Sequence, residues 1–103
     1  MPPGTLAMLI LRVLRSGPLH GYAIAQRIRV LSESVLDAEE GSLYPMLQRL
    51  LLEGWASAEY GTSETGRRVR FYTLTREGAR QLKREIADYE SATAAIQNIL
   101  RIA

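Results

Sequence analysis

Three arginines within four residues, Arg67, Arg68 and Arg70, are the side chains whose spacing most directly indicates a chemistry. A guanidinium group stays charged and offers paired donors that fit the oxygens of a phosphate. The segment from Arg67 to Arg84 contains seven basic residues and one acid, which is a net charge of +6. This density favours a phosphate-binding surface over a patch that only improves solubility.

A second polar set lies in residues 40–54, between apolar residues with helical spacing. Ser42, Gln48 and Arg49 fall on the side of this helix opposite Leu43 and its apolar partners, together with Pro45. Tyr44 lies at the border of the polar side. Such groups can bind base edges or phosphates in a major groove. By composition alone, an ordinary solvated helix face fits this pattern equally well.

Enzymatic chemistry has little support in this sequence. It has no cysteine and one histidine, His20, which excludes thiolate zinc sites, disulfides and cysteine nucleophiles. Glu39 and Glu40 form an adjacent carboxylate pair, but no base, nucleophile or metal ligand accompanies them. Stabilisation of a helix N-terminus explains these acids better, and a capping or packing role explains His20. We expect no catalytic residue, no metal and no cofactor.

Length and charge place the chain among single-domain globular proteins. It has 103 residues, 47% hydrophobic and 23% charged, with a net charge of only +2. That small value hides a polarised chain, because the segment from Glu33 to Glu64 contains seven acids and one base. The longest apolar stretch, Leu6–Leu14, is interrupted by Arg12 and falls short of the roughly 20 residues that span a bilayer. With no signal-peptide pattern either, we expect a cytoplasmic protein without membrane contact.

Three helices are predicted before residue 55. The first covers residues 5–16, is apolar on nearly every side and is stopped by Ser16-Gly17-Pro18. The second covers about residues 20–31, with an apolar stripe of Tyr22, Ile24, Ala25, Ile28 and Leu31. The third begins near Glu40 or Gly41 and ends at Gly54, and Pro45 is expected within its first turn. Its apolar face comprises Leu43, Met46, Leu47, Leu50 and Leu51.

Two extended runs and a long helix follow. Residues 55–60 and 68–75 are predicted to be extended, and the second run is rich in strand formers. The glycine-containing turn between them predicts a β-hairpin. Thr75 is expected to cap the last helix. The apolar positions of this helix repeat at steps of three and four, which is a heptad seam typical of a helix that packs against another helix. The seam comprises Ala79, Leu82, Ile86, Tyr89, Thr93, Ile96 and Leu100.

These elements predict a mainly α fold with a small β-hairpin, an α+β winged helix-turn-helix of order α-α-α-β-β-α. Residues 1–75 would form the winged helix-turn-helix unit and residues 76–103 a C-terminal dimerisation helix, within one compact domain. The seam predicts a homodimer, with Leu82, Ile86, Tyr89, Thr93, Ile96 and Leu100 at the interface.

Three fragments make the sequence resemble the PadR family of transcriptional regulators. They are Leu19-His20-Gly21-Tyr22, the run from Gly41 to Leu47 followed by Arg49-Leu50 and Glu53-Gly54, and Arg70-Phe71-Tyr72-Thr73-Leu74-Thr75 with Gly78. The resemblance covers essentially the whole chain. The chain is similar to the short members of the family, which have a single helix after the wing. It implies a homodimeric repressor whose third helix reads the major groove while the wing touches the backbone and minor groove.

The resemblance also implies site residues. On the third helix, Ser42, Tyr44 and Pro45 would contact double-stranded DNA together with Gln48 and Arg49, and on the wing Arg67, Arg68 and Arg70 would do so. Tyr22 is expected in the core, and Phe71 and Tyr72 as anchors of the wing. Some short members bind flat aromatic compounds on a tryptophan of the last helix. The only tryptophan here, Trp55, lies at the start of the wing instead. Candidate residues for a small aromatic effector are Met8, Tyr89 and Thr93, between the first and last helices across the dimer axis, although simple filling of the core explains these residues better.

One alternative function stays open at this point. A winged-helix module that binds protein, with the acidic segment as its contact surface, would have the same helices and hairpin. Salt dependence of DNA affinity separates the two, because only phosphate contacts release counterions.

Overall fold

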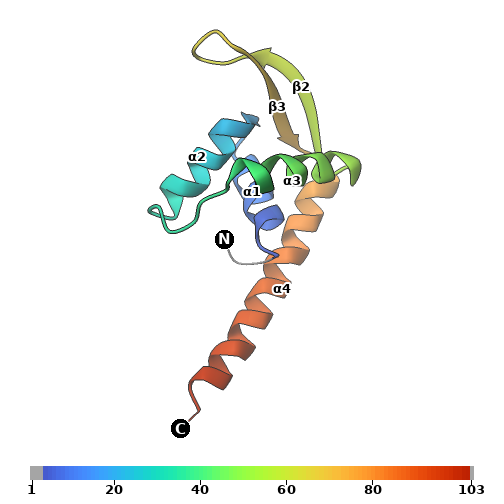
Figure 1. Ribbon diagram of the computed structural model, residues 1–103. Helices are drawn as coiled ribbons and strands as arrows, with labels where there is room; N and C mark the ends of the chain where they lie inside the picture. Colours follow the sequence, from blue (N-terminus) through green and yellow to red (C-terminus); the bar gives the residue numbers. More distant parts are fainter. Residues whose placement is uncertain (1–3, 103) are drawn as a thin grey trace.

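The computed structural model of the chain describes residues 4–102. Three short helices precede a twisted hairpin, and a long helix ends the chain (Figure 1). The elements are α1 (Leu6–Leu14), β1 (Leu19–His20), α2 (Gly21–Leu31), α3 (Glu40–Leu52), β2 (Ala56–Thr62), β3 (Arg68–Leu74) and α4 (Arg76–Leu100). The predicted winged helix-turn-helix is therefore present, with one additional strand.

The core surrounds α1, which packs against α2, α3, β3 and the first half of α4. This position explains why α1 is apolar on nearly every side. Leu82 of α4 is buried in the same cluster as α1, so the last helix shares the core of the preceding elements. The largest fully buried side chains are Ile10, Leu11, Leu14, Ile24, Leu43, Leu47, Leu50 and Leu82.

The predicted order omitted β1. Leu19 pairs with Tyr72 and His20 with Phe71, so β1 extends the hairpin into a three-stranded antiparallel sheet of order β1-β3-β2. A two-residue strand has no periodicity of its own, and only its partner β3 makes it a strand. Pairing β3 on both sides ties the base of the wing to the start of α2.

The apolar stripe expected on α2 was only partly right. Ile24 and Ile28 are buried as predicted, but Tyr22 is 68% exposed and Leu31 is also exposed. The expectation that Tyr22 packs in the core is therefore wrong. Tyr22 belongs to the first turn of α2, and its ring stacks beside that of His20 at a centroid distance of 6.4 Å. A short helix buries a narrow stripe, and its terminal residues extend past the neighbours that would cover them.

Pro45 lies deeper in α3 than predicted. It is the sixth residue of the helix, past the first turn in which the N–H groups have no intrahelical partner. An N–H at this position would bond to the carbonyl of Gly41, so the helix lacks one internal hydrogen bond. Both Gly41 and Pro45 are exposed, so water can satisfy that carbonyl.

Two helix caps follow the sequence predictions. The Nδ1 atom of His20 accepts a hydrogen bond from the amide of Ala23 at 3.2 Å, which caps α2. The Oγ1 atom of Thr75 accepts one from the amide of Gly78 at 2.9 Å, which caps α4. Both caps are confirmed. A cap depends on residues three positions apart in the chain, so the sequence alone can predict it.

Helix α4 packs on the body through its first half and extends away from the wing beyond it (Figure 1). The described molecule measures 57 Å along its longest axis and 29 and 22 Å across. Leu82 is 1% exposed, which places it in the chain's own core rather than at an interface. The large apolar side chains that the last helix exposes lie beyond Ile86. They are Tyr89, Ile96, Ile99 and Leu100, followed by Ile102.

None of the helices within residues 4–102 combines the length and the hydrophobicity that crossing a bilayer requires.

Candidate nucleic-acid interface

The outer face of α3 is free in this structure. Ser42, Pro45, Gln48 and Arg49 are all exposed, while Leu43, Leu47 and Leu50 of the same helix are buried. The 3.6-residue period of the helix separates the two sets. Its polar face thus presents a hydroxyl, an amide and a guanidinium to the outside, which are groups that hydrogen-bond to base edges and phosphates.

The three arginines of the wing are exposed on β3 and the turn before it. Arg68 and Arg70 alternate with half-buried Val69 and Phe71, as side chains on a strand must. Within residues 4–102 the ion pair between Arg80 and Glu77 is the one that the structure contains, so the wing arginines have no carboxylate partner there. Their charges remain available to an anion from outside.

Aromatic rings hold two of these guanidinium groups. Arg68 lies over the ring of Tyr60 at 4.5 Å from its centroid, and Arg70 lies over Tyr72 at 5.9 Å. Both distances fall within the range of cation–π contacts. Sequence reasoning missed Tyr60, which is exposed on β2 directly opposite Arg70. The usable signal is the hairpin register, which places Tyr60 beside the arginine-bearing strand.

Tyr72 and Phe71 anchor the wing, as expected. Tyr72 is buried, and the Phe71 ring meets His20 edge-on at 5.7 Å. Phe71 also covers Gly61 on the neighbouring strand, where an added Cβ would lie 2.8 Å from its ring. The turn at the tip is closed by the amide of Arg67, which donates to the hydroxyl of Ser63 at 3.2 Å. These contacts fix the position of the arginines relative to α2.

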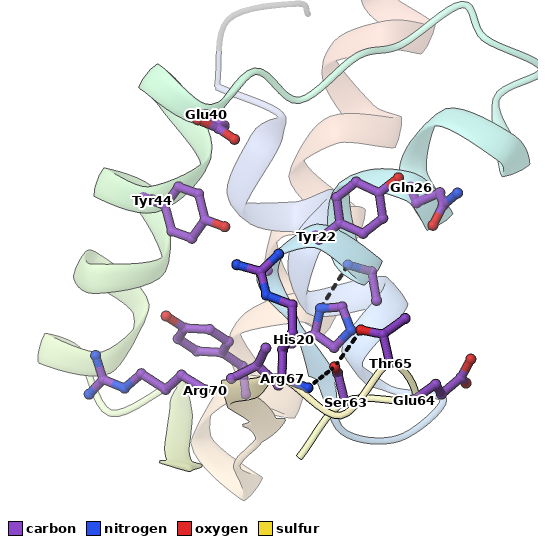
Figure 2. A pocket seen from close by; sticks show the side chains of 14 residues that line it. His20, Tyr22, Gln26, Glu40, Tyr44, Ser63, Glu64, Thr65, Arg67 and Arg70 are labelled. Carbon is purple, nitrogen blue, oxygen red and sulfur yellow. Dashed lines mark hydrogen bonds between the residues drawn. The ribbon is translucent and has the colours of Figure 1, made fainter. Parts of the chain in front are cut away.

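A cleft of about 780 Å³ lies between the start of α2, the first half of α3 and the wing. Figure 2 shows Tyr44, His20, Tyr22, Arg67 and Arg70 around it. Of the predicted DNA-contacting residues, Tyr44, Arg67 and Arg70 line this cleft. The remaining ones lie outside its lining: Ser42, Pro45, Gln48, Arg49 and Arg68.

Of the residues expected to line an effector pocket across the dimer axis, Met8 is buried in the core cluster of the single chain, Tyr89 is 48% exposed and Thr93 is half-buried on α4. On the same helix, Arg84 donates to the side-chain oxygen of Gln81 at 2.7 Å rather than pairing with Asp88 four residues on.

Among the described residues, no group of three or more His, Asp or Glu side chains could hold a metal ion.

Solved structures of transcriptional regulators share this arrangement of helices and wing. A regulator from Clostridium thermocellum of solved structure is 28% identical, with 95% of each chain covered and a TM-score of 0.87. A PadR family transcriptional regulator from Eggerthella lenta is 29% identical, covering 97% of this chain and 85% of that one at a TM-score of 0.81. An uncharacterised protein from Lysinibacillus sphaericus is 28% identical over 86 residues, which are 84% of this chain and 79% of that protein.

The family model described as the transcriptional regulator PadR-like family matches residues 10–84, from α1 through the wing to the first half of α4. Proteins of this family regulate transcription and are not enzymes. Because the match spans most of the chain and includes α3 and the wing, the chain belongs to the PadR-like family of transcriptional regulators.

Proposed function

We propose that this regulator is a repressor that binds an inverted-repeat operator in double-stranded DNA as a homodimer. The observation that carries the proposal is the pairing of a free polar face on α3 with three wing arginines that have no carboxylate partner within residues 4–102. In this assignment Ser42, Gln48 and Arg49 face the major groove. The arginines of the wing meet the backbone and the minor groove.

The distal half of α4 supports the homodimer. Tyr89, Ile96, Ile99 and Leu100 are large apolar side chains that the single chain leaves exposed at one end of a helix. A second copy of the same helix would remove this surface from water, and the three–four spacing of Thr93, Ile96 and Leu100 suits helix–helix packing. A two-fold dimer presents two recognition helices, so half-site centres should lie about 10 base pairs apart or at a multiple of this.

Selection of binding sites from random duplexes, followed by affinity measurements at several salt concentrations, tests the proposal. We expect an inverted repeat and an affinity that falls with salt at a slope of about −0.9 per phosphate contacted. Occupancy of the recovered site upstream of a reporter gene should lower transcription. A chain that binds no duplex even at low salt would be a protein-binding module instead, and the DNA-binding proposal would fail.

Arg70 and Gln48 are expected to contribute different kinds of contact. Arg70→Ala should weaken binding to all sequences alike and flatten the salt slope by about one unit, because phosphates carry charge without sequence. Gln48→Ala should relax preference at one base position, at a cost of about 1–3 kcal/mol there, and leave the salt slope unchanged. Filter binding or anisotropy with the selected duplex and its single-base variants measures both. A change of base preference in Arg70→Ala with an intact slope would contradict the role assigned to the wing.

Tyr60 is expected to act through Arg68. Since its ring lies under the Arg68 guanidinium, Tyr60→Leu should free that side chain and lower DNA affinity about two- to fivefold, the size of an exposed cation–π contact. Tyr60→Phe keeps the ring and should retain affinity. In a double-mutant cycle, Tyr60→Leu should cost little once Arg68 is already alanine. Additive losses in that cycle would show that Tyr60 contacts DNA independently of Arg68.

A further inference from the structure

The cleft between α2, α3 and the wing is lined by several residues that can donate hydrogen bonds. They are Arg67, Arg70, Tyr44 and His20. Two carboxylates also line the cleft, but Glu40 lies at the first turn of α3 and Glu64 at the wing turn, on opposite sides of these residues (Figure 2). Among the described residues neither acid forms an ion pair with the arginines.

Tyr44 is held in this cleft by packing on Gly21. A Cβ built on Gly21 would lie 2.9 Å from both Cε1 and Oη of Tyr44, closer than such contacts occur. The ring therefore rests on the bare backbone at the start of α2. In Figure 2 it extends from α3 into the cleft, on the side of Arg67 and Tyr22. The Tyr44 hydroxyl therefore lies in the cleft, against the start of α2.

The position of Tyr44 on the helix places it at the border between the buried and the exposed face. Successive residues of an α-helix differ by 100° about its axis, so Tyr44 lies about 60° from the buried Leu47 and about 40° from the exposed Gln48. When the outer face of α3 enters a groove, the border of the helix faces the groove wall. The wall of a groove is the sugar–phosphate backbone.

We propose that the cleft binds a phosphodiester group of the DNA backbone, with Tyr44 Oη donating to one oxygen and Arg67 and Arg70 neutralising its charge. The inference rests on the proposed DNA binding and assigns Tyr44 to the backbone instead of to a base. It also explains the glycine at position 21, because any side chain there would displace the Tyr44 ring.

Hydroxyl removal tests this assignment. Tyr44→Phe should lower affinity about tenfold, as expected for a hydrogen bond to a charged acceptor, on the selected duplex and on a random duplex of equal length. Base preference should not change. Gly21→Ala should reduce affinity in the same sequence-independent way, since the ring must shift by a few tenths of an ångström. Ser91→Ala removes an exposed hydroxyl on α4, outside the cleft lining, and serves as the control that retains affinity.

Duplexes in which one phosphate at a time is replaced by an uncharged methylphosphonate locate the contact. At one position the replacement should lower the DNA affinity of the wild-type protein but should not lower the affinity of Tyr44→Phe further. The reason is that the two changes remove the same hydrogen bond. Unchanged affinity of Tyr44→Phe, or a loss confined to one base identity, would overturn the inference while DNA binding stands. Absence of binding to every duplex by the wild-type protein would instead refute the proposed function. Thermal unfolding of each variant confirms that it folds.

Discussion

Gly78→Ala is expected to lower the free energy of unfolding by about 3 kcal/mol, the upper end of the usual cost of overpacking. A Cβ on Gly78 would lie 1.9 Å from the carbonyl oxygen of Trp55 and 2.8 Å from a methyl group of Leu74. The first of these is a backbone atom, so rotating a side chain cannot relieve the overlap. The first turn of α4 would have to move away from the base of the wing.

That junction has little freedom to adjust. The Trp55 carbonyl already accepts a hydrogen bond from the amide of Thr75 at 3.1 Å, and the Thr75 hydroxyl donates to the carbonyl of Gly54 at 2.7 Å. The same hydroxyl caps α4 at Gly78. Moving Gly78 would therefore strain the end of α3, the start of β2 and the cap of α4 together, and the energy of all three contributes to the expected cost.

Urea unfolding and thermal unfolding, each followed by circular dichroism, measure the effect. We expect a lower midpoint and a fall in melting temperature of roughly 10 °C or more, given about 4–8 °C per kcal/mol for a domain of this size. Gly41→Ala is the matched control, because a Cβ at Gly41 meets nothing within 4 Å in the first turn of α3. That variant should retain the wild-type free energy of unfolding or raise it by up to about 1 kcal/mol. Equal stabilities of the two variants would show that the junction at Gly78 is not tight.

Replacing Ile96 and Leu100 together with glutamate is expected to convert the proposed dimer into monomers and to weaken operator binding about 100-fold or more. Both residues lie one helical turn apart on the distal half of α4, and Ile96 is 55% exposed in the single chain. Four buried carboxylates at a two-fold interface would repel one another and lose their hydration. Without the dimer each half-site binds separately, and the gain from linking two binding events is lost.

Sedimentation and DNA binding should report this change together. The body of each monomer should stay folded, since Leu82 and the rest of the core lie outside the substituted surface. Val35→Glu provides a control in which an apolar residue that is 80% exposed, in the loop before α3, is also replaced by glutamate. It should remain dimeric. A wild-type chain that sediments as a monomer at micromolar concentration, or a doubly substituted chain that remains a dimer, would refute the interface on α4.

Local patterns in the sequence were enough to predict most elements of the fold. The helices, the hairpin and the caps at His20 and Thr75 depend on residues a few positions apart, so periodicity and turn chemistry carry that information. The same patterns identified the exposed side of α3 and the cations of the wing. These predictions held because a side chain's place on a helix or strand follows from its spacing once the buried face is known.

Contacts between distant segments decided the rest. β1 is a strand only because β3 lies beside it. Leu82, a residue of the seam, is buried in the chain's own core because α1 packs against the first half of α4. Gly21 and Gly78 leave no room for a side chain because the Tyr44 ring and the Trp55 carbonyl approach them closely. Sequence determined which residues share a helix face or a strand face. The tertiary structure alone decided which of those faces meet, because burial and close approach are properties of two segments and not of one.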